Sequence, residues 1–415
     1  MESVMRYAKS IFTFLSLLIC VNFFDFFDLN SGILSYYVSV TQKRLLLILI
    51  ICFLGIFSLT RSNNIYINKK SQFGLSVYYL IGVFVVVTIL TTYFYTGQSF
   101  TNTLSVSYYG FIALSYFIFR KIFKKDDWKN FAKLLTIFGT ILSITKIIQS
   151  FLLSNFGILL FHLNYQGDIS NAAYNRFKVL GFVRLPSVGD FLFCVIIVLL
   201  SLSVRFPEWK IFKYPYPIAI MVFCLIVVAQ TRAYTLLLLA IFIIYIYFRF
   251  SKKFSKDLKY LFLFSLSIAS MIVIYFAFTY LLNFQVGRAE SFDTRGLELK
   301  YYWGLIKQSP IFGVGFLRGD GVYQGITSGP FLNYYFSDIG IIGFLAQTGS
   351  LGVFFIIVLL TQLVISLRKS KNIGASLIIF TALVGSFIMR SLILPDNIFY
   401  LTIYLALLEF FSVEE

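Results

Sequence analysis

The sequence predicts an all-α integral membrane protein. Of its 415 residues, 59% are apolar, 20% are aromatic and only 13% are charged, whereas about a quarter of the residues of a soluble domain are charged. The apolar residues also form long runs, and a membrane-spanning helix needs about 20 of them. The basic residues behind the net charge of +17 lie between these runs, which argues against a nucleic-acid surface. We therefore expect one polytopic membrane domain over residues 1–415.

About twelve apolar stretches qualify as transmembrane helices. They lie near residues 10–28, 44–60, 73–96, 104–120, 131–152, 190–204, 216–230, 233–249, 260–283, 339–367, 374–390 and 397–412. Arg6 and Lys9 precede the first run as in a signal peptide, but no small-residue cleavage site follows, so this run is expected to remain as an anchor. The four cysteines lie inside apolar runs, so neither a disulfide framework nor a metal site is expected.

The distribution of Lys and Arg predicts the orientation in the membrane. An even number of spans puts both termini on one side, and basic residues concentrate on the cytoplasmic side. With cytoplasmic termini, the inner segments hold 15 Lys and 6 Arg, and the outer loops hold 4 Lys and 8 Arg. Arg grips phosphate or carboxylate through two parallel hydrogen bonds, so this excess predicts an extracytoplasmic anion site. The alternative is chance, together with pairing of Arg to Glu290, Asp293 and Glu298 in one loop.

Two extracytoplasmic loops, at about 153–189 and 284–338, are much longer than most others. Long loops on a rigid scaffold commonly carry function. The first contains Arg176, Arg184 and the only histidine, His162, for which a loop role is favoured over a catalytic one.

The second long loop contains a predicted amphipathic helix. It covers residues 298–308, and its apolar face is formed by Leu299, Trp303, Leu305 and Ile306. A helix lying on the outer leaflet fits this pattern. The glycine-rich run that follows, from Gly313 to Gly321, has no strand before it and is not expected to bind a nucleotide.

Two charged residues lie at the ends of apolar runs. Arg232 stands where two runs meet almost without a loop, and a charge inside the bilayer costs roughly 2.5 to 3.5 kcal/mol. We predict that Arg232 is an anion ligand at the outer end of the helical bundle. The alternative is an Arg at a helix end whose side chain reaches the lipid headgroups. Asp338 opens the tenth run. It is either a general base or sugar ligand or, with Ser337, a helix N-cap.

Sparse motifs follow one another in the chain from about residue 170 onward. They are Arg176 with Gly181 and Pro186, Thr231 with Arg232, Arg288, Arg295, the helix with Trp303, Pro310 with Gly313 and Gly315, Asn333, and Gly340 with Gly343. Their order resembles the O-antigen polymerase and O-antigen ligase superfamily. The resemblance covers about residues 170–365. It implies a GT-C-like helical bundle that uses undecaprenyl-diphosphate-linked glycans at the outer face of the bacterial inner membrane, with no metal or other cofactor.

Within this superfamily the sequence resembles the Wzy-type polymerases more than the ligases. The ligase branch carries a histidine ahead of its Asn, and no histidine stands between Ser328 and Asn333. We therefore expect a glycosyltransferase that joins lipid-linked repeat units into O-antigen or capsular polysaccharide. The alternatives are an O-antigen ligase that transfers the glycan to lipid A core, a flippase or secondary transporter of the same lipid-linked oligosaccharide, and a scaffold for other envelope enzymes.

These patterns together assign a role to each predicted site residue. The catalytic group comprises Arg232, Arg288 and Asp338. The substrate-binding group comprises Arg176, Arg184, Arg295, Tyr301, Trp303, Asn333 and Tyr334, although an outer aromatic belt is the alternative for the aromatic members. The expected partners are the bilayer, undecaprenyl-diphosphate-linked oligosaccharides, and a chain-length regulator and flippase of the same pathway, but no nucleic acid.

Overall fold

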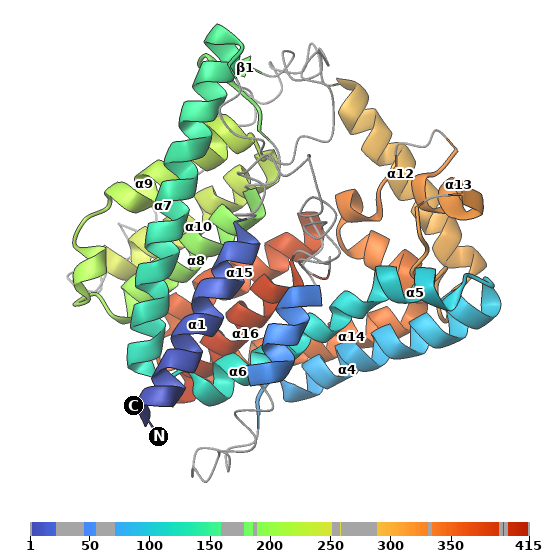
Figure 1. Cartoon of the computed structure of the whole chain (residues 1–415), viewed down its shortest axis with the longest axis horizontal. Helices are drawn as coiled ribbons and strands as arrows, with labels where there is room; N and C mark the ends of the chain where they lie inside the picture. The colour runs from blue at the N-terminus through green and yellow to red at the C-terminus, as the bar shows by residue number, and fades with distance from the viewer. Residues whose placement is uncertain are drawn as a thin grey trace. The chain divides into compact units, whose positions relative to one another are not determined.

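The computed structural model of the chain is almost entirely helical in the residues that it describes (Figure 1). These residues are 2–21, 45–54, 71–158, 178–185, 189–250, 258, 289–319, 321–330, 334–389, 393 and 397–413. The strands found among them, β1 (Lys178–Val179) and β2 (Phe182–Val183), form one short antiparallel hairpin. The predicted all-α class is therefore confirmed in its main feature.

Three of the described helical segments are long and apolar enough to cross a membrane. The first is Gly74–Tyr95, in which α4 (Gly74–Val86) continues into the π-helical η3 (Val87–Tyr95). The others are α7 (Lys125–Phe156) and α14 (Ile341–Lys369). Shorter apolar helices coincide with further predicted runs, but the ninth run, 260–283, lies outside the described residues. The number of twelve spans therefore stays a prediction.

The chain divides into two compact units. Unit 1 comprises residues 1–50, 122–280 and 374–379, and unit 2 comprises 51–121, 281–373 and 380–415. The helix α15 (Ile373–Met389) contributes residues to both units.

Unit 1 is built around α8 (Gly189–Arg205). Its residues from Phe191 to Val204 are all buried, as expected for a helix that is apolar on every side and enclosed by protein. Its neighbours are α7, α9 (Tyr216–Phe223) with the π-helical turn η6 (Cys224–Ala229), and α10 (Arg232–Phe250). The helix α1 (Glu2–Cys20) packs on α7.

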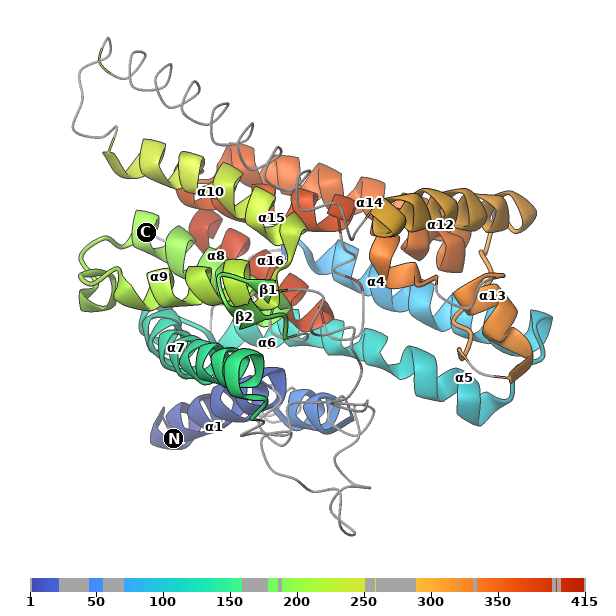
Figure 2. The ribbon, with the colours of Figure 1, turned by 90° about the horizontal axis from the view of Figure 1, so that it is seen from above.

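Unit 2 is built around α16 (Ile398–Val413), whose residues Ile398 to Glu409 are all buried. The long helices α4 and α14 lie side by side in this unit (Figures 1 and 2). Its remaining described elements are α5 (Phe100–Ser107), η4 (Tyr108–Leu114), α6 (Ser115–Ile122), α12 (Ala289–Gln308), η9 (Gly321–Tyr323), α13 (Gln324–Ser328) and η10 (Phe336–Ile339).

A buried carboxylate joins the elements of unit 2 that the sequence assigns to the cytoplasmic side. Glu409 is 5% exposed, and its Oε1 accepts hydrogen bonds from Arg120 Nε at 2.8 Å and from the Gln72 backbone N–H at 3.2 Å. The Tyr116 hydroxyl donates to the other oxygen. A buried charge without partners is very unfavourable. Because these bonds provide the partners of Glu409, they hold α16, α6 and the residues just before α4 together.

Within each unit, a polar contact joins two segments that the sequence assigns to the same side of the membrane. In unit 1, Lys9 and Asp127 form an ion pair of 2.8 Å between two segments assigned to the inside. In unit 2, the outer turn after η3 meets the second outer loop, because Gln98 Oε1 accepts the Arg318 backbone N–H at 2.9 Å. These contacts agree with the expected sidedness, which itself stays a prediction.

Candidate functional site

The glycine-rich segment after α12 pairs with the backbone of α14. The helix α14 is interrupted at Gly349 (φ 58°, ψ −144°), and such an interruption frees backbone groups that need new partners. The Val314 N–H donates to the Ala346 carbonyl at 2.8 Å, and the Gly315 N–H donates to the Gln347 carbonyl at 3.0 Å. In return, the Ser350 N–H donates to the Pro310 carbonyl at 2.9 Å. The interruption is thus filled by a neighbouring piece of chain.

Two glycines make this backbone pairing possible. Gly313 has a φ of 70°, and a Cβ atom there would overlap the backbone of Gln347. Gly349 has a φ of 58°, and its Cβ would lie 2.6 Å from the carbonyl carbon of Ile311. Both positions therefore need a residue without a side chain that tolerates positive φ. The run that was not expected to bind a nucleotide instead fixes the end of α12 against α14.

The helix α12 packs against the protein through a face that contains a carboxyl group. The helix starts at Ala289, earlier than expected, and its buried residues include Glu298, Tyr302 and Leu305, at 2%, 0% and 8% exposure. These positions follow the spacing i, i+4 and i+7 of one helix face. Leu299 and Trp303, which belong to the apolar face predicted to lie on the outer leaflet, are 49% and 46% exposed. Their contact with the leaflet stays a prediction.

The tyrosines of this region hold neighbouring segments against α12. The Tyr302 hydroxyl donates to the Thr327 carbonyl at 2.7 Å, and the Tyr301 hydroxyl donates to the Gly325 carbonyl at 2.9 Å. Tyr334 is 3% exposed, and its ring centroid lies 5.7 Å from that of Tyr301. Of the three aromatic residues predicted to bind substrate, Trp303 is thus the most exposed.

Asp338 lies on the surface in η10, the turn that precedes α14. Its side chain is exposed, and Ser337 Oγ donates to its Oδ1 at 3.1 Å. The helix α14 begins at Ile341 after Gly340, and no side chain caps it. The alternative role of Asp338 or Ser337 as the N-cap of this helix is therefore wrong. The carboxylate of Asp338 remains open to a ligand.

A second carboxyl group, that of Glu298, lies next to Asp338. The Tyr335 N–H donates to it, but Oε2 is buried and has no hydrogen-bond partner among the described residues. Burial raises the pKa of Glu298, and the negative charge of Asp338 raises it further, whereas Arg295 and the Tyr335 bond lower it. The sequence presented Glu298 only as a partner for loop arginines. The one signal that could have singled it out was its helical spacing from Tyr302.

Arg295 is exposed on α12, one turn before Glu298. Unit 2 therefore brings together an arginine, a surface carboxylate and a buried carboxyl group, and the same helix α12 carries the exposed ring of Trp303. This combination provides a cation for an anionic group, a base for a hydroxyl proton and an aromatic surface for a sugar. It is the candidate site, and it contains Arg295, Glu298, Trp303 and Asp338.

Unit 1 contains two more of the predicted residues. Arg232 is the first residue of α10, and the Tyr234 hydroxyl donates to the carboxylate of Asp190 at the start of α8. The starts of α8 and α10 therefore lie close together, and helix N-termini carry partial positive charge that favours anions. Arg184 is exposed directly after β2, which Ser150 of α7 anchors through a 2.6 Å bond to the Val183 carbonyl.

Four sequence positions that bear on the predicted site lie outside the described residues. They are His162, Arg176, Arg288 and Asn333.

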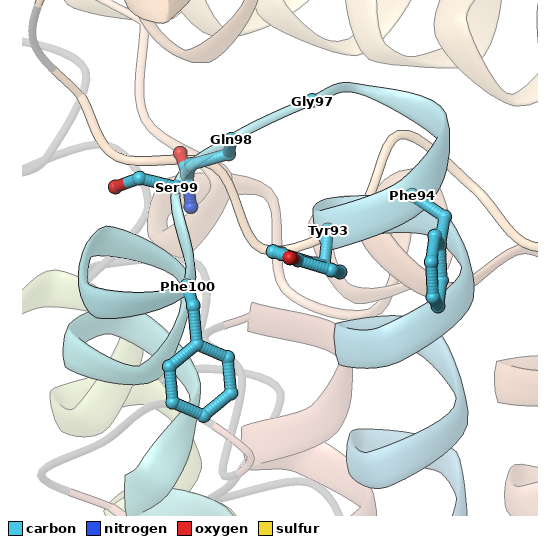
Figure 3. Close-up of a pocket in the computed structure, with 6 residues that line it drawn as sticks. All are labelled: Tyr93, Phe94, Gly97, Gln98, Ser99 and Phe100. Atoms are coloured by element: carbon cyan, nitrogen blue, oxygen red, sulfur yellow. The ribbon is translucent and has the colours of Figure 1, made fainter.

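A surface pocket lies at the turn between η3 and α5 (Figure 3). It has a volume of about 560 Å³ and is lined by Tyr93, Phe94, Gly97, Gln98, Ser99 and Phe100. The Gln98 side chain is engaged in bonds to the 316–318 segment, with its Nε2 donating to the Phe316 carbonyl at 3.3 Å. The pocket lining has no carboxylate or basic group, so it lacks the side chains that the proposed acid–base chemistry needs.

Comparison with known proteins gives one match. Residues 217–357 match the family model described as O-antigen ligase. The matched range contains Arg232 and the whole candidate site of unit 2. Neither a curated protein nor a solved structure matches the chain significantly, and the GT-C-like arrangement therefore stays a prediction. Over residues 217–357, the chain is therefore similar to the O-antigen ligase family.

Proposed function

We propose that the protein is a polysaccharide polymerase that joins undecaprenyl-diphosphate-linked repeat units at the outer face of the bacterial inner membrane. The observation that supports this proposal is the packing of α12 against η10, the two elements that carry Arg295 and Asp338. The site lies in the segment assigned to the outer side, where lipid-linked glycans are polymerised in this family. Both termini are proposed to be cytoplasmic.

The reaction is a glycosyl transfer. A hydroxyl oxygen of one lipid-linked repeat attacks the anomeric carbon of another lipid-linked chain, and the bond from that carbon to the diphosphate oxygen breaks. Undecaprenyl diphosphate leaves, and the hydroxyl proton passes to the carboxylate of Asp338. Arg295 donates hydrogen bonds to the diphosphate as negative charge develops on it. Arg232 and Arg288 are the further anion ligands that the sequence predicts.

The glycan contacts are proposed from exposure and residue type. Trp303 offers its ring to a sugar face, while Tyr301 and Tyr334 support the segments around it. Arg176, Arg184 and Asn333 remain proposed glycan ligands. A chain-length regulator and a flippase of the same pathway are proposed partners.

An O-antigen ligase is the second candidate function. The description of the matching family favours it directly. The polymerase is preferred because no histidine stands ahead of Asn333 in the sequence from Ser328 onward. A flippase is supported less, because the carboxylate and arginine of the candidate site lie at the surface of unit 2 in a segment assigned to the outer loop.

The glycan profile of a deletion strain tests the proposed function. Loss of the polymerase leaves single repeats attached to their final acceptor, because ligation and flipping continue. Electrophoresis of the extracted polysaccharide should then show one short species in place of the long chains, and plasmid-borne wild-type protein should restore the long chains. Complete loss of attached repeats would instead identify a ligase or flippase.

The substitution Arg232→Lys is expected to shorten the polymer sharply while the protein still inserts normally. Lys keeps the positive charge but lacks the planar group that binds a diphosphate through two parallel bonds. Chain length on a gel and protein level by immunoblot give the measurement. Arg249→Lys at the other end of α10, where Nη1 donates to the Ser203 carbonyl at 3.1 Å, is the matched control. Wild-type chain length in the Arg232→Lys strain would mean that Arg232 only reaches the headgroups.

A further inference from the structure

Glu298 is a buried acid on a helix whose other charged residues, where their burial is described, are exposed. The side chain is 2% exposed, whereas Arg295 and Lys300 of the same helix are exposed. Burying a carboxyl group without full hydrogen bonding costs free energy. In the part of the chain that the structure describes, Oε2 has no hydrogen-bond partner, so the described bonds offset this cost only in part. A carboxyl group kept in such a place therefore needs an explanation beyond packing.

The bonds of Glu298 lead directly to Asp338. The carboxyl of Glu298 accepts the Tyr335 N–H, and the Tyr335 carbonyl accepts the Asp338 N–H at 3.0 Å. One turn further along α12, the Tyr302 ring packs on Phe336 with centroids 4.5 Å apart. Glu298 and Tyr302 thus both hold the start of the short turn that carries Asp338. The position of the Asp338 carboxylate depends on this pair.

We propose that Glu298 is a positioning residue of the polymerase site, which fixes the η10 turn beneath Asp338 and makes the ability of the site to accept a proton depend on pH. This inference rests on the proposed function. Because Oε2 is buried, Glu298 does not touch substrate and acts through Asp338. An ionised carboxylate accepts an N–H more strongly than a neutral carboxylic acid does. The Tyr335 N–H, and with it the turn that carries Asp338, is therefore held most firmly while Glu298 is ionised.

The charged and titratable groups around Glu298 define the direction of the pH effect. Asp338 faces it from η10, Arg295 precedes it on α12, and the Tyr302 hydroxyl lies on the same helix face. Burial and the charge of Asp338 raise the pKa of Glu298 above its usual value. Its negative charge is therefore present above that raised pKa and lost as the pH falls through it. Transfer should weaken with that loss.

The test uses Glu298→Gln in full-length protein reconstituted in vesicles with purified lipid-linked repeat units. Gln keeps a carbonyl for the Tyr335 N–H and nearly the same volume but carries no charge. We expect kcat to fall about tenfold or more, with KM for the lipid-linked substrate nearly unchanged. The acid limb of the pH–rate profile should move to lower pH, because the carboxyl group with the raised pKa is gone.

Controls separate this inference from the proposed function. Glu208→Gln, an exposed residue in a segment assigned to the cytoplasmic side, should leave rate and pH profile unchanged. If Glu298→Gln keeps both the rate and the acid limb of the wild type, the positioning role is refuted. If the wild type joins no repeats but transfers glycan to a lipid A core acceptor, the polymerase proposal fails, and the same two measurements on that transfer decide the role of Glu298. Glu298→Asp should retain the acid limb at a reduced rate.

Discussion

Replacing Gly313 by alanine is expected to remove most of the folded protein from the membrane. The new Cβ would overlap the backbone of Gln347, and the backbone there has a φ of 70°. Left-handed backbone alone costs a non-glycine residue roughly 1 to 2 kcal/mol. Overlap with a main chain that is itself hydrogen-bonded adds to this, because neither segment can move without breaking the bonds at Val314 and Gly315. The sum should exceed about 4 kcal/mol, a value reached by few single substitutions.

Gly321→Ala is the matched control for this prediction. Gly321 also has positive φ, 59°, but nothing lies within 4 Å of a Cβ built there. The Gly321→Ala variant should lose only the free energy that positive φ costs a non-glycine residue. It should therefore keep most of its protein level and polymer length. Immunoblots of membranes and thermal unfolding in detergent measure both variants. If the two variants had the same protein level and the same unfolding temperature, the backbone pairing of the glycine-rich segment with α14 would be contradicted. Gly349→Ala should resemble Gly313→Ala, since it blocks the same pairing from the other side.

The parts of the fold that could be predicted are the helices that are marked by long runs of apolar residues. The runs at 73–96, 131–152 and 339–367 are long enough to be recognised in the sequence, and α4 with η3, α7 and α14 lie there. The pairing of residues 310–315 with the interruption in α14 could not be predicted. It depends on backbone groups more than 30 residues apart in the sequence, and the glycines alone do not show which chain approaches them.

The members of the candidate site that could be predicted from the sequence are those whose proposed role requires an exposed side chain. Arg295, Trp303 and Asp338 were identified from residue type and position in an outer loop, and all three are exposed. Glu298 was missed as a member of the site because hydropathy assigns a carboxylate to the surface. Tyr334 was expected at the substrate, but its aromatic ring is buried. Aromatic residues favour both sugar contacts and tight packing, and the sequence does not separate the two.

Asp338→Asn is expected to abolish most polymerisation at a normal protein level. Asn has nearly the shape of Asp and keeps an oxygen that can accept the bond from Ser337 Oγ. It cannot take the proton of the attacking hydroxyl, and loss of a general base lowers rates by about 10²-fold or more. A structural explanation through helix capping does not apply, because Gly340 occupies the N-cap of α14.

The rate of a single transfer between purified lipid-linked repeats measures this effect without interference from substrate supply. A factor of 10² corresponds to about 2.7 kcal/mol of transition-state stabilisation. Asp126→Asn, an exposed carboxylate in the first turn of α7, makes the same chemical change in a segment assigned to the cytoplasmic side and should leave the rate unchanged. Asp338→Glu, which keeps a titratable group on a longer side chain, should regain part of the lost rate. If Asn sustains the wild-type rate, the hydroxyl proton passes to another group, and the carboxylate of Asp338 has no part in the transfer.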